Sequence, residues 1–238
     1  MKSYVIPAPK MPTVSVSGGA EDRFPVRRIF CVGRNYAEHT REMGGNPDRE
    51  PPFFFTKPGD AVVDLPYPGK AIPYPPLTEK LHHEVELVIG VGRGGARLNP
   101  DQAINHVWGA AVGVDLTRRD LQEVAKAERR PWDWAKGFDD SAPCAPLVPL
   151  ADIPSLTQGS IWLSVNGEQR QRADLADLVW SVSELIAHCS HSVRLAPGDL
   201  IYTGTPAGVG PLVPGDRVEC GIGDWTRLSF SIDPLAAD

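Results

Sequence analysis

The chain contains 238 residues, carries a formal net charge of −6 and has an isoelectric point near 5.5. This acidic balance, without any cluster rich in lysine and arginine, argues against a nucleic-acid partner. No apolar run approaches the roughly 18 residues that a membrane span needs, and the N-terminus lacks the pattern of a secretory signal. The four cysteines are scattered and form no C-x-x-C pair, so we expect reduced thiols and a cytoplasmic protein.

The first half of the chain predicts short strands joined by turns. Residues 1–25 are interpreted as an extended N-terminal arm, and residues 26–238 as a single domain. Between the first two strands, residues 35–45 predict a short helix that ends at two glycines. Four mainly apolar segments are interpreted as strands in this half, at 26–33, 51–63, 81–91 and 108–117.

Capping and turn signals organise the segments that follow. Asn99 before Pro100 predicts a helix start, because Asn accepts hydrogen bonds from exposed backbone N–H groups and Pro suits the first turn. The charged run 118–130 predicts a third helix. Asn166-Gly167 lies between two strand-like runs and predicts a tight hairpin turn.

The second half adds one more helix, expected at about 177–190, and strands near 198–206 and 216–222. Together these patterns predict a β-rich α+β fold with antiparallel sheet dominating the second half.

The strand at 81–91, "LHHEVELVIGV", contains two carboxylates in an otherwise apolar run. Side chains alternate along a strand, so Glu84 and Glu86 are expected on one face, roughly 6.5 Å apart. Two like charges on a partly buried face repel each other, and a lower effective dielectric strengthens the repulsion. A bound cation would compensate them.

Asp115 ends the apolar run 108–117 and is a candidate third ligand. A buried carboxylate must be paired, protonated or bound to a metal, although Asp115 could equally cap the helix that follows. With Glu84 and Glu86 it would supply three hard oxygen ligands, which suit Mg²⁺ or Mn²⁺ better than zinc.

His39 and Glu42 form a second constellation on the short helix at 35–45. They are three residues apart and therefore share one helix face. A carboxylate beside an imidazole can raise its basicity and fix its tautomer, which makes a water-activating dyad. A solvated surface pair is the alternative, because Glu38 and Arg41 are nearby.

A dinucleotide fingerprint is spelled by Gly90, Gly92 and Gly95, but its context does not fit. The helix should open inside the glycine motif, whereas the capping signal falls at Asn99. We interpret these residues as turn glycines.

Two further motifs are also interpreted as structural. "AHCSH" at 187–191 lacks a fourth zinc ligand at suitable spacing. "TGTPAGVG" at 203–210 has neither the lysine nor the following helix of a phosphate-binding P-loop.

Six ordered blocks of the sequence resemble the fumarylacetoacetate hydrolase family, most closely its small bacterial members that cleave acylpyruvates. The resemblance covers nearly the whole chain after residue 25. The blocks are "GRNYAEHTREMG" (33–44), "FFFTKPGDAVV" (53–63), "HHEVELVIGVG" (82–92), "GVDLTRRDLQ" (113–122), "WDWAKGFDDSAP" (132–143) and "LAPGDLIYTGTPAGVG" (195–210).

This resemblance implies a rolled, mixed β-sheet, a homodimer, and a Mg²⁺ or Mn²⁺ site. Matched position by position, it implies these roles: Glu84, Glu86 and Asp115 as metal ligands, His39 and Glu42 as the water-activating dyad, Lys136 near metal and substrate, Arg119, Gln122 and Thr205 near the substrate oxygens. Lys57 lies in a family block without a clear role.

The implied reaction is hydrolysis of a carbon–carbon bond in a 1,3-diketo acid, most closely 3-fumarylpyruvate, an intermediate of aromatic catabolism through gentisate. A second carboxylate on the substrate needs a cationic partner, for which Arg34 and the Arg118-Arg119 pair are candidates. Oxaloacetate decarboxylation or 2-oxo acid tautomerisation on the same metal is the alternative. A non-catalytic binding protein is disfavoured because the carboxylate triad is complete.

Overall fold

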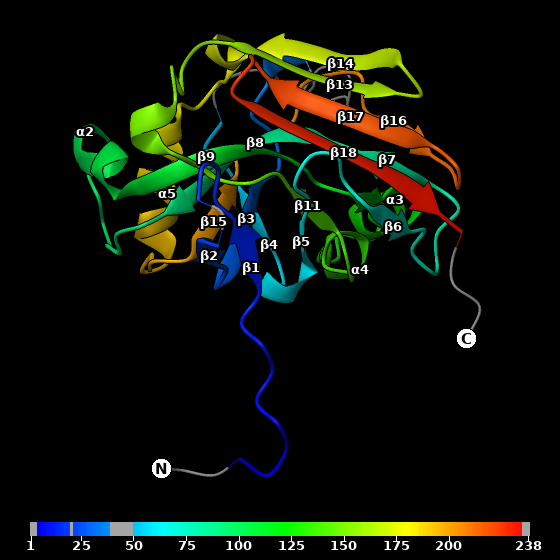
Figure 1. The fold of residues 1–238 in the computed structure, drawn as a ribbon, viewed down its shortest axis with the longest axis horizontal. Helices are drawn as coiled ribbons and strands as arrows, with labels where there is room; N and C mark the ends of the chain where they lie inside the picture. The colour runs from blue at the N-terminus through cyan, green and yellow to red at the C-terminus, as the bar shows by residue number, and fades with distance from the viewer. Residues whose placement is uncertain (1–3, 20, 39–49, 235–238) are drawn as a thin grey trace.

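The computed structural model describes residues 4–19, 21–38 and 50–234. The helix predicted at 35–45 lies mostly outside these residues, as do His39 and Glu42, so their roles stay predictions. The elements form two facing sheets with short helices at the edges, which agrees with the predicted β-rich α+β class (Figure 1).

The larger sheet has eight strands and is mixed, with parallel pairs β3·β15 and β5·β11. Its central strand β8 is buried along its whole length, as expected for an apolar run covered on both faces. The order is β4 (Phe54–Lys57), β3 (Arg28–Val32), β15 (Asp199–Tyr202), β8 (Val85–Val91), β9 (Val107–Val114), β11 (Ala142–Cys144), β5 (Val62–Asp64), with β12 (Val148–Pro149) also pairing β9.

A five-stranded sheet packs on the first through contacts of β17 and β18 with β9 (Figure 1). Its order is β14 (Glu168–Asp174), β13 (Ser160–Val165), β17 (Arg217–Ile222), β18 (Thr226–Asp233), β6 (Ala71–Pro73). The predicted hairpin turn is confirmed: Asn166 and Gly167 connect β13 to β14 with φ values of 53° and 81°. Ile161, Leu163 and Val165 alternate inward from β13 into the core between the sheets.

A small three-stranded sheet joins distant parts of the chain at one end of the molecule. It consists of β10 (Thr117–Arg118), β7 (Leu81–His83) and β16 (Gly210–Leu212). This sheet holds the segments around residues 84, 115 and 205 close to one another, which positions the candidate site.

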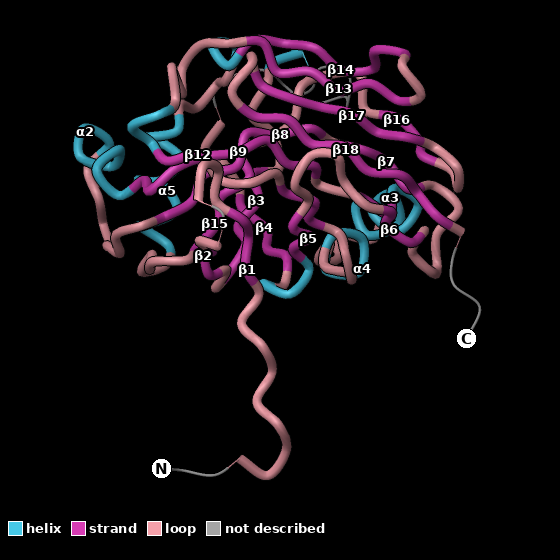
Figure 2. Tube along the Cα trace, in the orientation of Figure 1, coloured by secondary structure: helices cyan, strands magenta, loops and turns pink. Residues whose placement is uncertain are grey.

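The stretch before residue 26 has two parts. Residues 4–12 extend away from the body and are mostly exposed (Figure 2). The following strands β1 (Thr13–Ser15) and β2 (Arg23–Pro25) pair with each other, and their Val14 and Phe24 side chains are buried in the core.

The helices are short. α2 (Pro100–Ala103) begins after Asn99, whose side chain accepts from the Asp101 N–H, so the predicted cap is confirmed. The other described helices are α3 (Arg119–Ala127), α4 (Asp133–Lys136) and α5 (Val182–Ser192), with 3₁₀ turns η1 (Gly59–Ala61), η2 (Ile104–His106), η3 (Leu150–Asp152), η4 (Leu175–Asp177).

α5 begins five residues later than the sequence predicted, because Ser181 and Glu184 form a capping box that fixes its first turn. Within the described ranges, no helix has the length and apolar character needed to cross a membrane. The glycines of the apparent dinucleotide fingerprint lie on and after a strand that pairs antiparallel with β9, and the next helix starts only at Pro100. The dinucleotide-binding turn is therefore absent at these glycines, but Gly90 lies on β8 itself and Gly95 forms a β-bridge with Leu195, so the interpretation of all three as turn glycines is wrong for these two.

Candidate metal centre and substrate pocket

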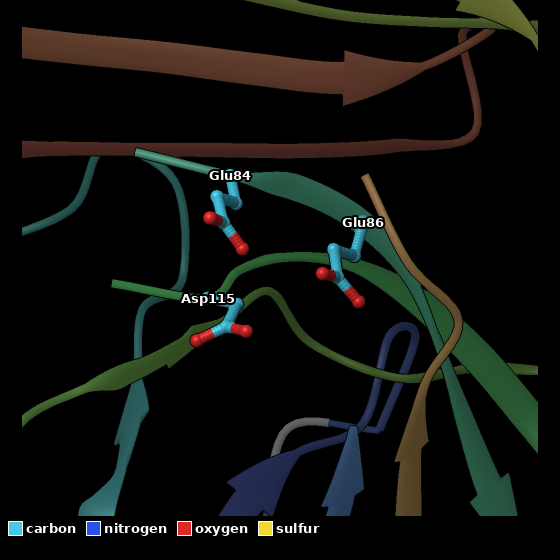
Figure 3. A group of neighbouring side chains, drawn as sticks. All are labelled: Glu84, Glu86 and Asp115. Atoms are coloured by element: carbon cyan, nitrogen blue, oxygen red, sulfur yellow. The ribbon is translucent and has the colours of Figure 1, made fainter. Parts of the chain in front are cut away.

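Three carboxylates converge at the ends of β8 and β9 (Figure 3). Glu84 lies in the break between β7 and β8, Glu86 on β8, and Asp115 directly after β9. The antiparallel pairing of these strands sets Asp115 beside Glu84, and its N–H donates to the Glu84 carbonyl at 2.8 Å. One oxygen from each side chain lies within 4.8 Å of the others, and the residues are 6%, 1% and 0% exposed.

Two buried lysines oppose this concentration of negative charge. The Nζ of Lys136, on α4, lies 2.7 Å from Glu84 Oε2 and 2.7 Å from Asp115 Oδ2, and it also donates to the Thr117 hydroxyl at 2.6 Å. The Nζ of Lys57, at the end of β4, lies 2.8 Å from the other Asp115 oxygen. The sequence suggested no role for Lys57; the structure makes it an ion-pair partner of Asp115.

The pKa values of Lys136 and Glu86 reflect this balance. Burial lowers the pKa of Lys136, but the attraction of Asp115 and Glu84 outweighs it, so the pKa is raised overall and the ammonium persists. Burial, followed by repulsion from Asp115 and Glu84, raises the pKa of Glu86 well above its ordinary value. A cation placed among the three carboxylates would reverse that repulsion.

The donor set fits a hard divalent cation. Carboxylate oxygens are the ligands that Mg²⁺ and Mn²⁺ prefer, and three of them leave coordination positions for water or substrate oxygens. Glu86 is also oriented by a backbone contact, because the Gly204 N–H donates to its Oε2 at 2.7 Å. In the described part of the chain, the triad is the one group of three or more His, Cys, Asp or Glu side chains close enough to hold a metal.

A pocket adjoins the carboxylate triad through Glu84 and Glu86. It contains five of the residues expected to bind or act on substrate, namely Arg34, Arg119, Gln122, Lys136 and Thr205, together with Glu84 and Glu86. Arg119 extends toward the carboxylate triad and donates hydrogen bonds to both Glu84 and Gln122. The fold thus gathers these positions from distant segments around one cavity.

Lys126 also lines the pocket, although the sequence interpretation missed it. Its spacing from Arg119 and Gln122 is the signal that could have found it, because positions i, i+3 and i+7 share one helix face. Burial and repulsion from Arg34 and Arg119 lower the pKa of Lys126. Together with Arg34, Arg119 and Lys136 it makes four cationic side chains that line this cavity. Phe55 and Trp132 complete its apolar side.

Arg118 is separated from its neighbour Arg119. It donates to the Trp134 carbonyl at 3.3 Å and lies over the Phe138 ring at 4.3 Å, away from the pocket. Because Arg118 is in a strand and Arg119 starts a helix, the two guanidinium groups diverge. Of the two candidates for a cationic partner of the substrate, Arg119 therefore lines the pocket and Arg118 does not.

The alternative motifs keep their structural interpretation. His188 and His191 lie on α5, and the His188 ring packs edge-on against Trp180 at 4.6 Å. The segment 203–209 is a loop that leads into β16 rather than into a helix.

Three buried carboxylates lie together beside a polar pocket in this β-rich fold. This arrangement is typical of an enzyme with a carboxylate metal site. Residues 28–232 match the family model described as fumarylacetoacetate (FAA) hydrolase C-terminal, and the chain belongs to this family. The family predicted from the six sequence blocks is confirmed.

Individual relatives agree with this assignment. The chain is 41% identical to the fumarylpyruvate hydrolase of a Ralstonia species over 194 residues, which cover 81% of this chain and 99% of that protein. It is 38% identical to the human mitochondrial oxaloacetate tautomerase over 207 residues, covering 87% of this chain and 92% of the relative. The crystal structure of fumarylpyruvate hydrolase from Pseudomonas aeruginosa in complex with Mn²⁺ and pyruvate superimposes with a TM-score of 0.95 at 44% identity, covering 98% and 100% of the two chains.

Proposed function

We propose that this protein is a divalent-metal-dependent hydrolase that cleaves 3-fumarylpyruvate to fumarate and pyruvate. The observation that carries the proposal is the buried triad of Glu84, Glu86 and Asp115, of which Glu84 and Glu86 line a pocket that also contains cationic side chains. The similarity to two fumarylpyruvate hydrolases supports the same substrate.

The triad would hold Mg²⁺ or Mn²⁺, as supported by the Mn²⁺ and pyruvate complex of the Pseudomonas relative. When bound, the metal supplies a Lewis acid that favours release of pyruvate as its enolate. Lys136 contacts both Glu84 and Asp115 and would add positive charge where negative charge develops. Arg119, Gln122 and Thr205 line the same cavity and would orient the oxygens of the 2-oxo acid.

The water that attacks the distal carbonyl requires a general base. His39, supported by Glu42, is proposed for this role from the sequence motif, which begins just after the described residues Ala37 and Glu38. Tyr36, next to this segment, is buried in the core. The dyad distinguishes hydrolysis from reactions that need only enolate stabilisation.

The cations at the pocket favour a substrate with two carboxylates. Arg119 is already paired with Glu84, whereas Arg34 and Lys126 line the cavity without an anionic partner among the described residues. They are therefore proposed to bind the distal carboxylate of fumarylpyruvate. The test is a comparison of kcat/KM for fumarylpyruvate and acetylpyruvate, which lacks that carboxylate. If acetylpyruvate is an equal or better substrate, the enzyme is a general acylpyruvate hydrolase.

Oxaloacetate tautomerisation or decarboxylation is the second candidate function. The observation that favours it is the 38% identity with a protein named as an oxaloacetate tautomerase. Both reactions use the enolate-stabilising half of the site without water attack. A preparation that converts oxaloacetate faster than any acylpyruvate, with unchanged rate in His39→Ala, would support this alternative.

We also propose a homodimer that works in the cytoplasm, in the gentisate branch of aromatic catabolism. Exposed apolar side chains on the extended residues 4–12, including Tyr4, Val5 and Ile6, are consistent with an interface between copies. All four cysteines are free and buried, which suits a reducing compartment. Light scattering at micromolar concentration should give twice the chain mass.

A further inference from the structure

Gln171 links the strand of the metal ligands to the loop that carries Thr205. It lies on β14 and is 1% exposed. Its Oε1 accepts from the N–H of Val85, the residue between Glu84 and Glu86, at 3.0 Å. Its Nε2 donates to the Pro206 carbonyl at 2.9 Å and to the Thr205 hydroxyl oxygen at 2.8 Å.

The two backbone contacts fix which end of the amide is which. A backbone N–H can only donate and a carbonyl can only accept, so Oε1 must face Val85 and Nε2 must face Pro206. The Thr205 oxygen therefore receives an N–H from Gln171, and its own proton cannot point back toward the amide. Thr205 lines the substrate pocket, and within the described residues its hydroxyl donates no hydrogen bond.

A β-bulge turns Gln171 toward the site. Gln169 pairs with Ser164 and Gln171 with Leu163, which leaves Arg170 without a partner in the ladder. In a regular strand, residues 169 and 171 would share one face. The extra residue reverses this, so Gln169 is exposed while Gln171 is buried.

The loop that carries Thr205 packs directly on this bulge. Gly208 has a φ of +90°, and a Cβ built there would lie 2.1 Å from the Arg170 carbonyl oxygen. Only glycine permits so close an approach of the two backbones. The bulge, the amide and the loop thus form one contact region beside the pocket.

We propose that Gln171 is a positioning residue, which holds the Thr205 hydroxyl so that its proton is donated to an oxygen of the bound 2-oxo acid. The inference rests on the proposed function for the kind of ligand, a metal-chelating 2-oxo acid or its enolate. Gln171 itself would not contact the ligand.

The test is a double-mutant cycle read by oxalate binding to the Mn²⁺-loaded protein, measured by calorimetry. Oxalate mimics the two chelating oxygens of the pyruvate enolate, and its binding needs no turnover. Gln171→Glu replaces the donor with an acceptor, which would draw the Thr205 proton away from the pocket. Thr205→Val removes the hydroxyl at nearly constant volume. Gln169→Glu, the same substitution on the exposed face of β14, is the matched control.

We expect Gln171→Glu and Thr205→Val each to weaken oxalate binding by roughly tenfold or more, as for a hydrogen bond to a charged acceptor. In the Thr205→Val background, Gln171→Glu should change binding by no more than about twofold. Thr205→Ser should bind like the parent, and so should Gln169→Glu. The carboxylate introduced by Gln171→Glu would also repel the Pro206 carbonyl. That repulsion is present in the parent and in the Thr205→Val background alike. The difference between the two backgrounds therefore reports only the effect on the Thr205 hydroxyl.

Additive effects of the two substitutions would overturn the proposal, because a purely structural role of Gln171 would not depend on the hydroxyl. Parent-like oxalate binding by Thr205→Val would overturn it as well, even if Gln171→Glu does not fold. Failure of the parent to hydrolyse fumarylpyruvate would refute the proposed function but leave this binding cycle readable.

Discussion

Lys136 and Asp115 form an ion pair of 2.7 Å that is removed from solvent, with side chains 2% and 1% exposed. The same ammonium group contacts Glu84, so one lysine links two members of the carboxylate triad. Buried charges are tolerated only when they are paired, and Lys136 is the partner that Asp115 and Glu84 share.

Replacing Lys136 by methionine should destabilise the metal-free protein by about 3–5 kcal/mol, because buried carboxylates lose a partner. Mn²⁺ should recover part of this loss by supplying positive charge at the same place. Thermal unfolding with and without Mn²⁺ measures both effects. We also expect kcat to fall by roughly 10²–10³-fold, as for loss of a group that stabilises developing charge. A metal-free variant as stable as the parent would show that the lysine does not balance the triad.

His39→Ala should lower hydrolysis by roughly two to four orders of magnitude, the usual contribution of a general base. The variant should still bind Mn²⁺ and oxalate, because the triad and the pocket residues remain. Steady-state kinetics and calorimetry on the same preparation provide the comparison. Parent-like hydrolysis would remove His39 from the mechanism.

Lys126→Met should raise KM for fumarylpyruvate more than for acetylpyruvate, since it removes a cation proposed to meet the distal carboxylate. A charge-assisted hydrogen bond of roughly 1.5–3 kcal/mol corresponds to a loss of at least about tenfold. Lys80→Met is the matched control, because Lys80 pairs with Glu123 at the exposed surface. Equal effects on both substrates would show that Lys126 does not recognise that carboxylate.

The folded protein should react very slowly with an aromatic disulfide reagent at pH 8. Burial raises the pKa of Cys144 and of Cys189 to about 12, and it raises the pKa of Cys31 and Cys220 as well, so the thiols stay protonated and shielded. Unfolded thiols ionise near pH 8.5. Stability should therefore fall as the pH rises above that value, because the unfolded chain releases protons that the folded chain retains. Denaturation should expose all four thiols; rapid labelling of the native protein would contradict the burial.

Local patterns were sufficient to locate the metal triad. Glu84 and Glu86 are separated by one residue in an apolar run, and Asp115 ends another, so the apolar neighbours predicted burial of all three and their like charges predicted a compensating cation. What this pattern lacked was the antiparallel register of β8 and β9, which sets Asp115 beside Glu84. The roles of Lys136 and Thr205 came only from the family resemblance, because no local signal links positions so far apart in the chain.

Two other residues illustrate what the sequence could not supply. The inward position of Gln171 depends on the bulge at Arg170, and simple alternation would have placed it on the same face as Gln169. The divergence of Arg118 from Arg119 depends on where the strand ends and the helix begins. Both are decided by hydrogen bonding to other segments, which a single sequence does not reveal.

The most direct test of the account is Mn²⁺ binding and turnover measured together after exhaustive chelation. The parent should be inactive when stripped and should regain hydrolysis in proportion to one Mn²⁺ bound per chain. Glu84→Gln/Glu86→Gln should neither bind Mn²⁺ at that stoichiometry nor recover activity, whereas Glu123→Gln, a control in an exposed carboxylate of α3, should do both. Full turnover by the stripped parent, or parent-like metal binding and activity in the double variant, would contradict the assignment of the triad as the metal centre.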